Sequence, residues 1–166
     1  MSESTKKALA VALKNVMKIK SFDKIIVQDI TKECGINRQT FYYHFQDRFD
    51  LICWIYYNEV FLPVIEKLTE DNYSESILLM LNIMINDREF YKNALYISID
   101  NRFMEYIYSI FESIVEIISK QQKESIDVCF YAHGLLGIVT AWIKRDLDYP
   151  VDELANKITN YLETIK

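Results

Sequence analysis

The chain has 166 residues, of which 51% are hydrophobic, three are glycine and two are proline. This composition excludes a disordered chain and favours long helices around a sizeable core. The net charge of −5 is uneven: residues 1–50 hold nine basic and six acidic residues (+3), and the rest holds ten basic and eighteen acidic (−8). A basic head on an acidic body is typical of a nucleic-acid-binding domain joined to a domain with another task.

The cysteines and the N-terminus indicate a cellular compartment. Cys34, Cys53 and Cys129 are odd in number and far apart, which predicts neither a disulfide framework nor a zinc site. The N-terminus lacks the apolar core of a signal peptide, and no apolar run approaches the length of a membrane span. We therefore expect a cytoplasmic protein without cofactor, metal or membrane contact.

The first helix is predicted over residues 4–18, and a second begins near Val27. Val27, Ile30 and Cys34 recur at helical spacing. Gly35 can end this helix in the left-handed conformation, and Asn37 is a strong N-cap for a third helix that starts at Arg38.

The third helix has two chemically different faces. Phe41 and Phe45 are one turn apart and are predicted to face inward. The outward residues are polar or aromatic: Arg38, Gln39, Thr40, Tyr42, Tyr43 and His44. This arrangement predicts a helix-turn-helix whose second helix carries donor types that read a DNA groove.

The remaining chain is predicted to be helical, which gives an all-α fold of about nine helices. Asp47 should cap the next helix, and Pro63 should kink that helix or end it near Leu62. Ser74 is the expected cap of the following helix. Further helices are predicted over residues 89–99, 101–120 and 124–146 and from Val151 onward.

Small residues run through the middle of the 124–146 helix, at Ala132, Gly134, Gly137 and Ala141. Bulky apolar residues surround them, so apolar side chains circle the helix. This pattern fits close packing within the chain or a four-helix bundle between two copies.

Aromatic and methionine side chains between residues 54 and 106 can line a ligand cavity or fill a core. His133 lies on an otherwise apolar helix, where a hydrogen-bonded core or interface histidine is more common than a ligand contact. The candidate pocket residues are Trp54, Tyr57, Met84, Tyr96, Phe103, Tyr106 and His133. No Gly-rich phosphate loop or catalytic triad signature is present, so we do not expect an enzyme.

The run from Gly35 to Phe45, followed by Asp47, Arg48 and Leu51, resembles the DNA-binding domain of TetR-type transcriptional regulators. The resemblance implies a DNA-binding domain over residues 1–47 and a regulatory and dimerisation domain over 48–166. It also implies a homodimer formed through the last two helices, which binds a palindromic operator and whose DNA binding is controlled by a small effector or partner protein. The interface residues expected from this are Leu135, Val139, Trp142, Leu154, Ile158 and Leu162.

The candidate DNA contacts combine side-chain chemistry with this resemblance. Arg38 can pair with guanine or clamp a phosphate, and Gln39 and Gln28 can bond base edges. The resemblance assigns contacts to the sugar-phosphate backbone to Thr40, Tyr42, His44 and Arg48. Tyr43 is a further candidate that can also pack against the first helix. Val27 stands where the family commonly has a Thr or Ser that caps the helix and bonds a phosphate, so we expect that contact to be missing.

The stretch from Tyr131 to Trp142, followed by Pro150 and Leu154, resembles the C-terminal domain of the dihydroxyacetone-kinase-regulator (DhaS-like) branch. That branch implies an activator that takes its signal from a partner protein. The alternative function, of a different kind, is a helical module that binds a partner protein and does not bind DNA.

Overall fold

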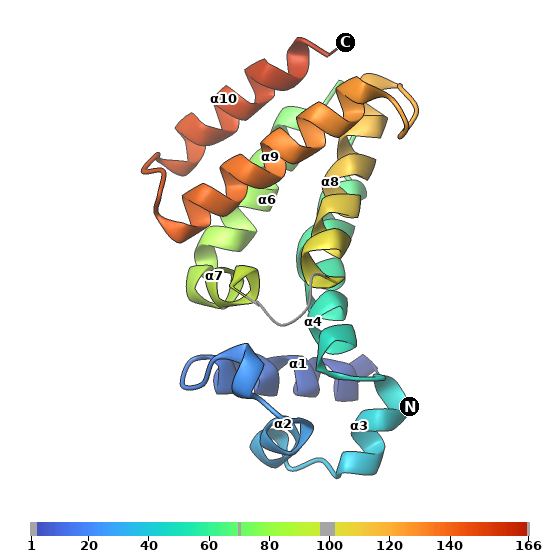
Figure 1. The fold of residues 1–166 in the computed structure, drawn as a ribbon, viewed down its shortest axis with the longest axis vertical. Coiled ribbons are helices and arrows are strands. Elements are labelled where there is room, and N and C mark those ends of the chain that lie inside the picture. Colours follow the sequence, from blue (N-terminus) through green and yellow to red (C-terminus); the bar gives the residue numbers. More distant parts are fainter. Residues whose placement is uncertain (1–2, 70, 97–101, 166) are drawn as a thin grey trace.

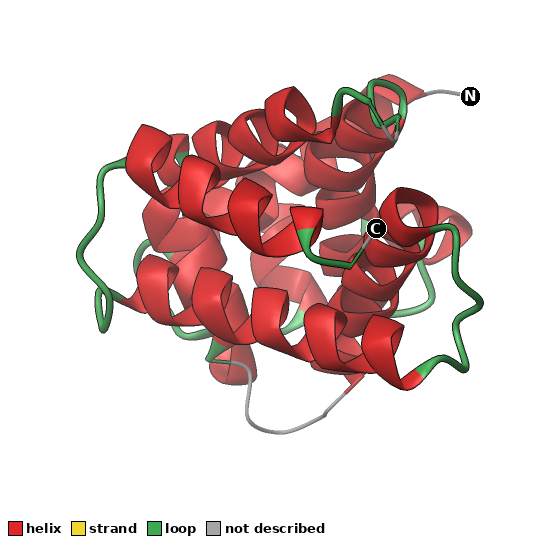
Figure 2. Ribbon diagram, turned by 90° about the horizontal axis from the view of Figure 1, so that it is seen from above, coloured by secondary structure: helices red, strands yellow, loops and turns green. Residues whose placement is uncertain are grey.

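The computed structural model describes residues 3–69, 71–96 and 102–165, and Figure 2 shows that the regular elements there are helical. A small head contains α1 (Glu3–Met17), the 3₁₀ turn η1 (Phe22–Lys24), α2 (Val27–Cys34) and α3 (Arg38–His44). A larger body contains α4 (Arg48–Tyr56), the π-helical turn η2 (Tyr57–Phe61), α5 (Leu62–Ile65), α6 (Tyr73–Asn86), α7 (Arg88–Leu95), α8 (Arg102–Ser119), α9 (Ile126–Lys144) and α10 (Val151–Glu163). With α4, η2 and α5 counted as one continuous helix, the described residues form nine helices. The all-α prediction is confirmed.

The head is built around side chains from each of its helices. Leu9 and Leu13 of α1, Ile30 of α2 and Phe41 of α3 are fully buried. These positions belong to the apolar stripes that the sequence predicts, so the three short helices bury their inward faces against one another. Figure 1 shows α4 leaving the head and rising into the body.

Asp47 starts α4 as predicted. Its carboxylate accepts the backbone N–H groups of Phe49 at 2.7 Å and Asp50 at 2.9 Å. The Asp50 carboxylate reaches back to the N–H of Gln46 at 3.0 Å, so both acids satisfy N–H groups at the junction of α3 and α4.

The helix does not end near Leu62, because η2 leads directly into α5, which contains Pro63 and runs to Ile65. In η2 the Leu62 N–H donates to the Tyr57 carbonyl, five residues back. Such a turn holds one extra residue, and proline lacks the N–H that an α-helical turn needs at its own position. The predicted end at Leu62 is therefore wrong, and the irregularity lies just before the proline.

Arg88 of α7 holds the C-terminal end of α9. Its guanidinium donates to the carbonyls of Trp142 and Ile143 and lies 5.3 Å from the Trp142 ring centroid. The Trp142 indole N–H donates to the Tyr149 carbonyl at 2.9 Å. A cation that satisfies the last carbonyls of a helix stabilises its negative end.

Two further boundaries differ from the prediction. The first turn of α6 begins at Tyr73, so Ser74 lies inside the helix rather than before it. The short helix α7 ends at Leu95, and residues 97–99 of the range predicted for it lie outside the described residues.

Among the described helices, α9 alone is long and apolar enough to cross a membrane by length and composition. An 18-residue window of it has a mean hydropathy of 1.6, and 33% of that window is buried within the chain. The expectation that no run approaches the length of a span is therefore wrong for α9. Core helices of water-soluble proteins meet the same criteria, and α9 packs along α8.

Candidate nucleic-acid interface

A glycine and an asparagine build the turn between α2 and α3. Gly35 has φ 68°, and the Ile36 N–H closes the turn on the Thr31 carbonyl at 3.0 Å. The Asn37 side chain accepts the Thr40 N–H at 2.7 Å, so α3 starts at Arg38. The predicted helix-turn-helix is confirmed at both positions.

The inner face of α3 anchors it in the head. Phe41 is fully buried and Phe45 is 3% exposed, with their ring centroids 5.9 Å apart. The outer residues have different exposures: Arg38, Gln39, Tyr42 and Tyr43 are exposed, and Thr40 and His44 are half-buried. Tyr43 is 72% exposed and its ring contacts that of His44, so its predicted alternative of packing against α1 is wrong.

Residues of α2 and α3 meet along one shallow hollow. Gln28 on the first turn of α2 lines it together with Arg38 and Tyr42, and its volume is about 450 Å³. The Arg38 guanidinium donates to the Tyr42 hydroxyl at 3.1 Å and lies 5.4 Å from its ring centroid. The Gln28 amide and the Arg38 guanidinium, which can both bond base edges, therefore lie side by side at the open end of the head.

The start of α2 is capped without a Ser or Thr at Val27. The Asp29 carboxylate accepts the Ile26 N–H at 2.9 Å and pairs with the Lys20 ammonium at 2.5 Å. These two contacts, the backbone hydrogen bond first, hold the pKa of Asp29 below its ordinary value of 3.8. Asp29 therefore takes over the capping role, and Lys20 is a partner that the sequence pattern did not reveal.

Arg48 has different partners from those expected for a phosphate contact. Its half-buried guanidinium donates to the backbone carbonyls of Asp23 and Ile25, and it lies 5.0 Å from the Phe22 ring centroid. A guanidinium with these partners holds η1 and the segment that leads into α2. In this structure Arg48 therefore supports the candidate DNA-binding surface indirectly, through the backbone that leads into α2.

The seven candidate pocket residues do not share one cavity among the described residues. Trp54 packs on Phe45 of the head, Tyr96 is exposed beneath Lys144, and His133 lies against Tyr108. The others also differ in burial: Met84 and Phe103 are in the packed core, Tyr106 is half-buried and Tyr57 is exposed. The prediction that these residues line a single pocket is therefore wrong.

His133 is exposed and hydrogen-bonded locally, and it is not a core histidine. Its Nδ1 lies 2.9 Å from the carbonyl oxygen of Cys129, one turn earlier, and 3.6 Å from the Cys129 Sγ. The described residues contain no group of three potential metal ligands.

The six predicted interface residues are buried inside the chain. Leu135, Val139 and Trp142 of α9 and Leu154, Ile158 and Leu162 of α10 are at most 4% exposed. They pack against the body's own helices, and two of them, Leu135 and Leu162, also line a groove between α9 and α10. The structure does not support an interface role for the other four, which face the core, because α9 is apolar on most of its circumference and its inward side could not be identified from the pattern.

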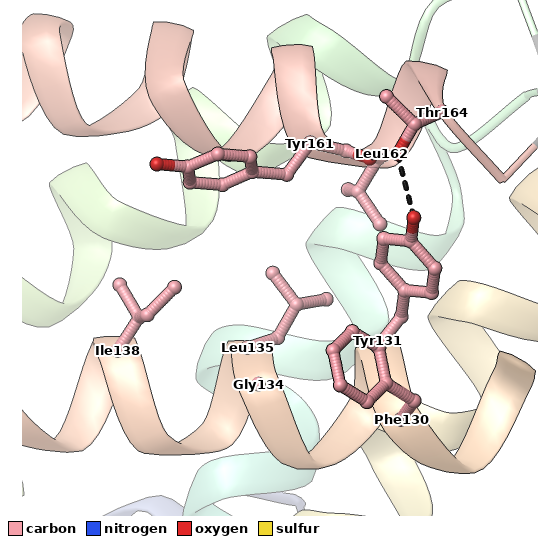
Figure 3. Close-up of a pocket in the computed structure, with 8 residues that line it drawn as sticks. All are labelled: Phe130, Tyr131, Gly134, Leu135, Ile138, Tyr161, Leu162 and Thr164. Atoms are coloured by element: carbon pink, nitrogen blue, oxygen red, sulfur yellow. Dashed lines mark hydrogen bonds between the residues drawn. The ribbon is translucent and has the colours of Figure 1, made fainter.

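The outward side of α9 and α10 carries a different apolar set. Phe130 is 73% exposed and Tyr161 is 55% exposed. Between the helices lies a groove of about 260 Å³, closed at one end by a 2.6 Å hydrogen bond between Tyr131 and Thr164 (Figure 3). A Cβ built on Gly134 or Gly137 would meet nothing within 4 Å. Packing within the chain therefore does not explain these two glycines.

The chain is similar to known proteins in both sequence and fold. Residues 9–52 match the model of bacterial regulatory proteins of the tetR family, and residues 71–164 match that of a transcriptional regulator C-terminal region. The chain belongs to the TetR family. The two matches together cover the head and most of the body, including both helices that border the groove.

A curated relative is the HTH-type dhaKLM operon transcriptional activator DhaS of Lactococcus lactis, 29% identical over 122 residues. That match covers 73% of this chain, and the chain spans 64% of the relative's length. A solved structure of a dihydroxyacetone kinase operon activator DhaS has a TM-score of 0.75 at 25% identity, with 98% of this chain and 96% of that one covered.

The fold is shared more widely. NalD, a secondary repressor of a multidrug efflux pump in Pseudomonas aeruginosa, has a TM-score of 0.62 at 14% identity, with 98% of this chain and 95% of that one covered. These TetR-family relatives are described as transcriptional regulators, which agrees with the expectation that the chain is not an enzyme.

Proposed function

We propose that the chain is a transcriptional regulator that binds a palindromic operator in double-stranded DNA as a homodimer. The observation that carries the proposal is the outer face of α3, where Arg38, Gln39 and Tyr42 are exposed beside Gln28. The surplus of basic residues in residues 1–50 supports an anionic partner despite the net charge of −5. Double-stranded DNA is the partner that fits a helix-turn-helix of this kind.

Each residue has a role in this proposal. The Arg38 fork reads guanine, and Gln39 and Gln28 bond other base edges in the major groove. The backbone contacts come from Thr40, Tyr42, Tyr43 and His44, and Arg48 orients the segment before α2. Residues 1–47 thus form the DNA-binding domain, and residues 48–166 the regulatory and dimerisation domain.

A second copy of the chain is the partner proposed for the outward face of α9 and α10. Exposed Phe130 and Tyr161 supply apolar area, and the open space over Gly134 and Gly137 allows a close approach of another helix. A two-fold axis through this face presents two α3 helices to successive major grooves, ~34–36 Å or slightly more apart.

The body is proposed to sense a small effector or a partner protein in the cytoplasm. One buried group supports a ligand: the Tyr56 hydroxyl is fully enclosed and has no hydrogen-bond partner among the described residues. Burial raises the pKa of Tyr56, so this hydroxyl stays neutral and can donate. Similarity to the transcriptional activator DhaS favours activation as the second candidate, and the resemblance of the Tyr131–Trp142 stretch to that branch implies a signal from a partner protein.

The test is DNA binding by the intact protein. Fluorescence anisotropy with DNA from upstream of its own and neighbouring genes should show specific binding that weakens steeply with salt. Light scattering should give the mass of a dimer. If the protein binds no DNA sequence specifically, with or without cell extract as a source of effector, a helical interaction module becomes the better description.

A further inference from the structure

Lys14 of α1 is a half-buried cation where the head meets the body. Its side chain is 17% exposed, and its ammonium lies 2.5 Å from Glu59 Oε2 of η2 and 2.8 Å from Asp87 Oδ2, just before α7. The ammonium also lies 4.7 Å from the Phe90 ring centroid. One side chain of the head thus holds two separate segments of the body.

The body supports this arrangement from its own side. The Tyr91 hydroxyl donates to the same Glu59 oxygen at 3.2 Å, and burial together with Glu59 raises the pKa of Tyr91, which keeps it protonated. Glu59 lies inside the π-helical turn, whose extra residue changes the direction in which side chains point. A further bond, from the Asn93 amide to the Met17 carbonyl at 3.3 Å, fastens the end of α1 to α7.

These contacts bear on how the head is oriented. Helix α1 packs on α2 and α4, and α7 contacts it from the body. The other described ion pair between head and body, Arg102 with Asp47 at 3.2 Å, is more exposed and therefore weaker. Loss of Lys14 would leave Glu59 and Asp87 without their shared counter-ion, and solvent screening reduces the cost because these two carboxylates are 37% and 38% exposed.

We propose that Lys14 is a positioning residue that fixes the tilt of the head on the body and thereby sets the half-site spacing that the dimer accepts. This rests on the proposed function, since spacing matters only for a dimer on a two-part operator. Shifting the half-sites by one base pair rotates one of them by about 35°, which a rigidly held head cannot follow. A loosely held head can.

The experiment compares the parent, Lys14→Met and Lys18→Met on operators with half-sites moved apart or together by single base pairs. Lys18 is the matched control, because it is an exposed lysine of the head whose ammonium bonds only Asn15 among the described contacts. The parent and Lys18→Met should lose ~10-fold in affinity for each shift, and Lys14→Met less than ~3-fold, since couplings in such networks are of this size. Lys14→Arg should restore most of the spacing preference.

A second readout does not depend on DNA. Hydrogen exchange of the intact protein should be faster in Lys14→Met for α1 and the start of α7, and unchanged in α9 and α10. A spacing profile equal to that of the parent would overturn the positioning role while leaving DNA binding intact. Failure of the parent to bind any operator overturns the proposed function instead. If hydrogen exchange were then also equal in the parent and Lys14→Met, the role of Lys14 in holding the head on the body would be overturned as well.

Discussion

Arg38 and Arg48 both line the hollow at the open end of the head, but their guanidinium groups have different neighbours. Arg38 is exposed, and its contacts come from Tyr42 on the same helix. Arg48 is half-buried and bonds backbone carbonyls before α2. The first is free to leave its partner for a base, whereas the second would have to abandon carbonyl groups that need its donors.

Arg38→Ala should relax base preference at one position of each half-site. A bidentate pair with guanine is worth ~1–3 kcal/mol of discrimination, so affinity for the best operator should approach that for an operator changed at that base. Anisotropy titrations with all four bases at each position measure this. Unchanged discrimination at every position would place the reading contact elsewhere.

Arg48→Met should lower the stability of the protein. Hydrogen bonds to a charged group contribute ~1.5–3 kcal/mol each, so the melting temperature should fall by several degrees in a thermal scan. Affinity should fall alike for all sequences because the start of α2 is displaced. A variant as stable as the parent, with a shallower salt dependence of DNA binding, would instead support a direct phosphate contact.

At the scale of elements, the start of α2 depends on one carboxylate. The helix begins after Ile26, whose side chain cannot cap it, and Asp29 accepts the free N–H while it is ionised. Because folding lowers the pKa of Asp29, its contribution is complete above the ordinary value of 3.8 and is lost as the pH falls through the lowered value.

Asp29→Asn should therefore destabilise the protein near neutral pH, where it removes the charge that pairs with Lys20. The difference in unfolding free energy between parent and variant should be constant above pH 5 and should shrink as the pH falls below 3.8. Urea titrations at a series of pH values give this difference. A gap that does not change with pH would show that the charge of Asp29 contributes nothing.

The proposed dimer depends on the outward side of α9. Gly137→Arg should leave the monomer folded, because a side chain there meets no atom of the same chain within 4 Å. It should convert the dimer to a monomer in light scattering and weaken operator binding, while a change at exposed Asn82 of α6 should do neither. A Gly137→Arg protein that remains a dimer would move the interface to another face.

At the scale of the whole molecule, local patterns predicted the helices and the helix-turn-helix, since Gly35 and Asn37 act on their own turns. Contacts across the fold were not predictable in this way. Lys14 meets partners 45 and 73 residues away, and no spacing rule connects them. The inward side of α9 was also missed, because a helix that is apolar all round has no polar stripe to mark its outside.

The same all-round apolar character of α9 has a consequence for how the regulator responds to its own abundance. If two copies must cover Gly134 and Gly137 before both heads can engage an operator, the DNA-competent species forms by mass action. At copy numbers low enough for monomers to dominate, operator occupancy then rises with the square of the protein concentration. A modest change in expression is thereby turned into a larger change in transcription.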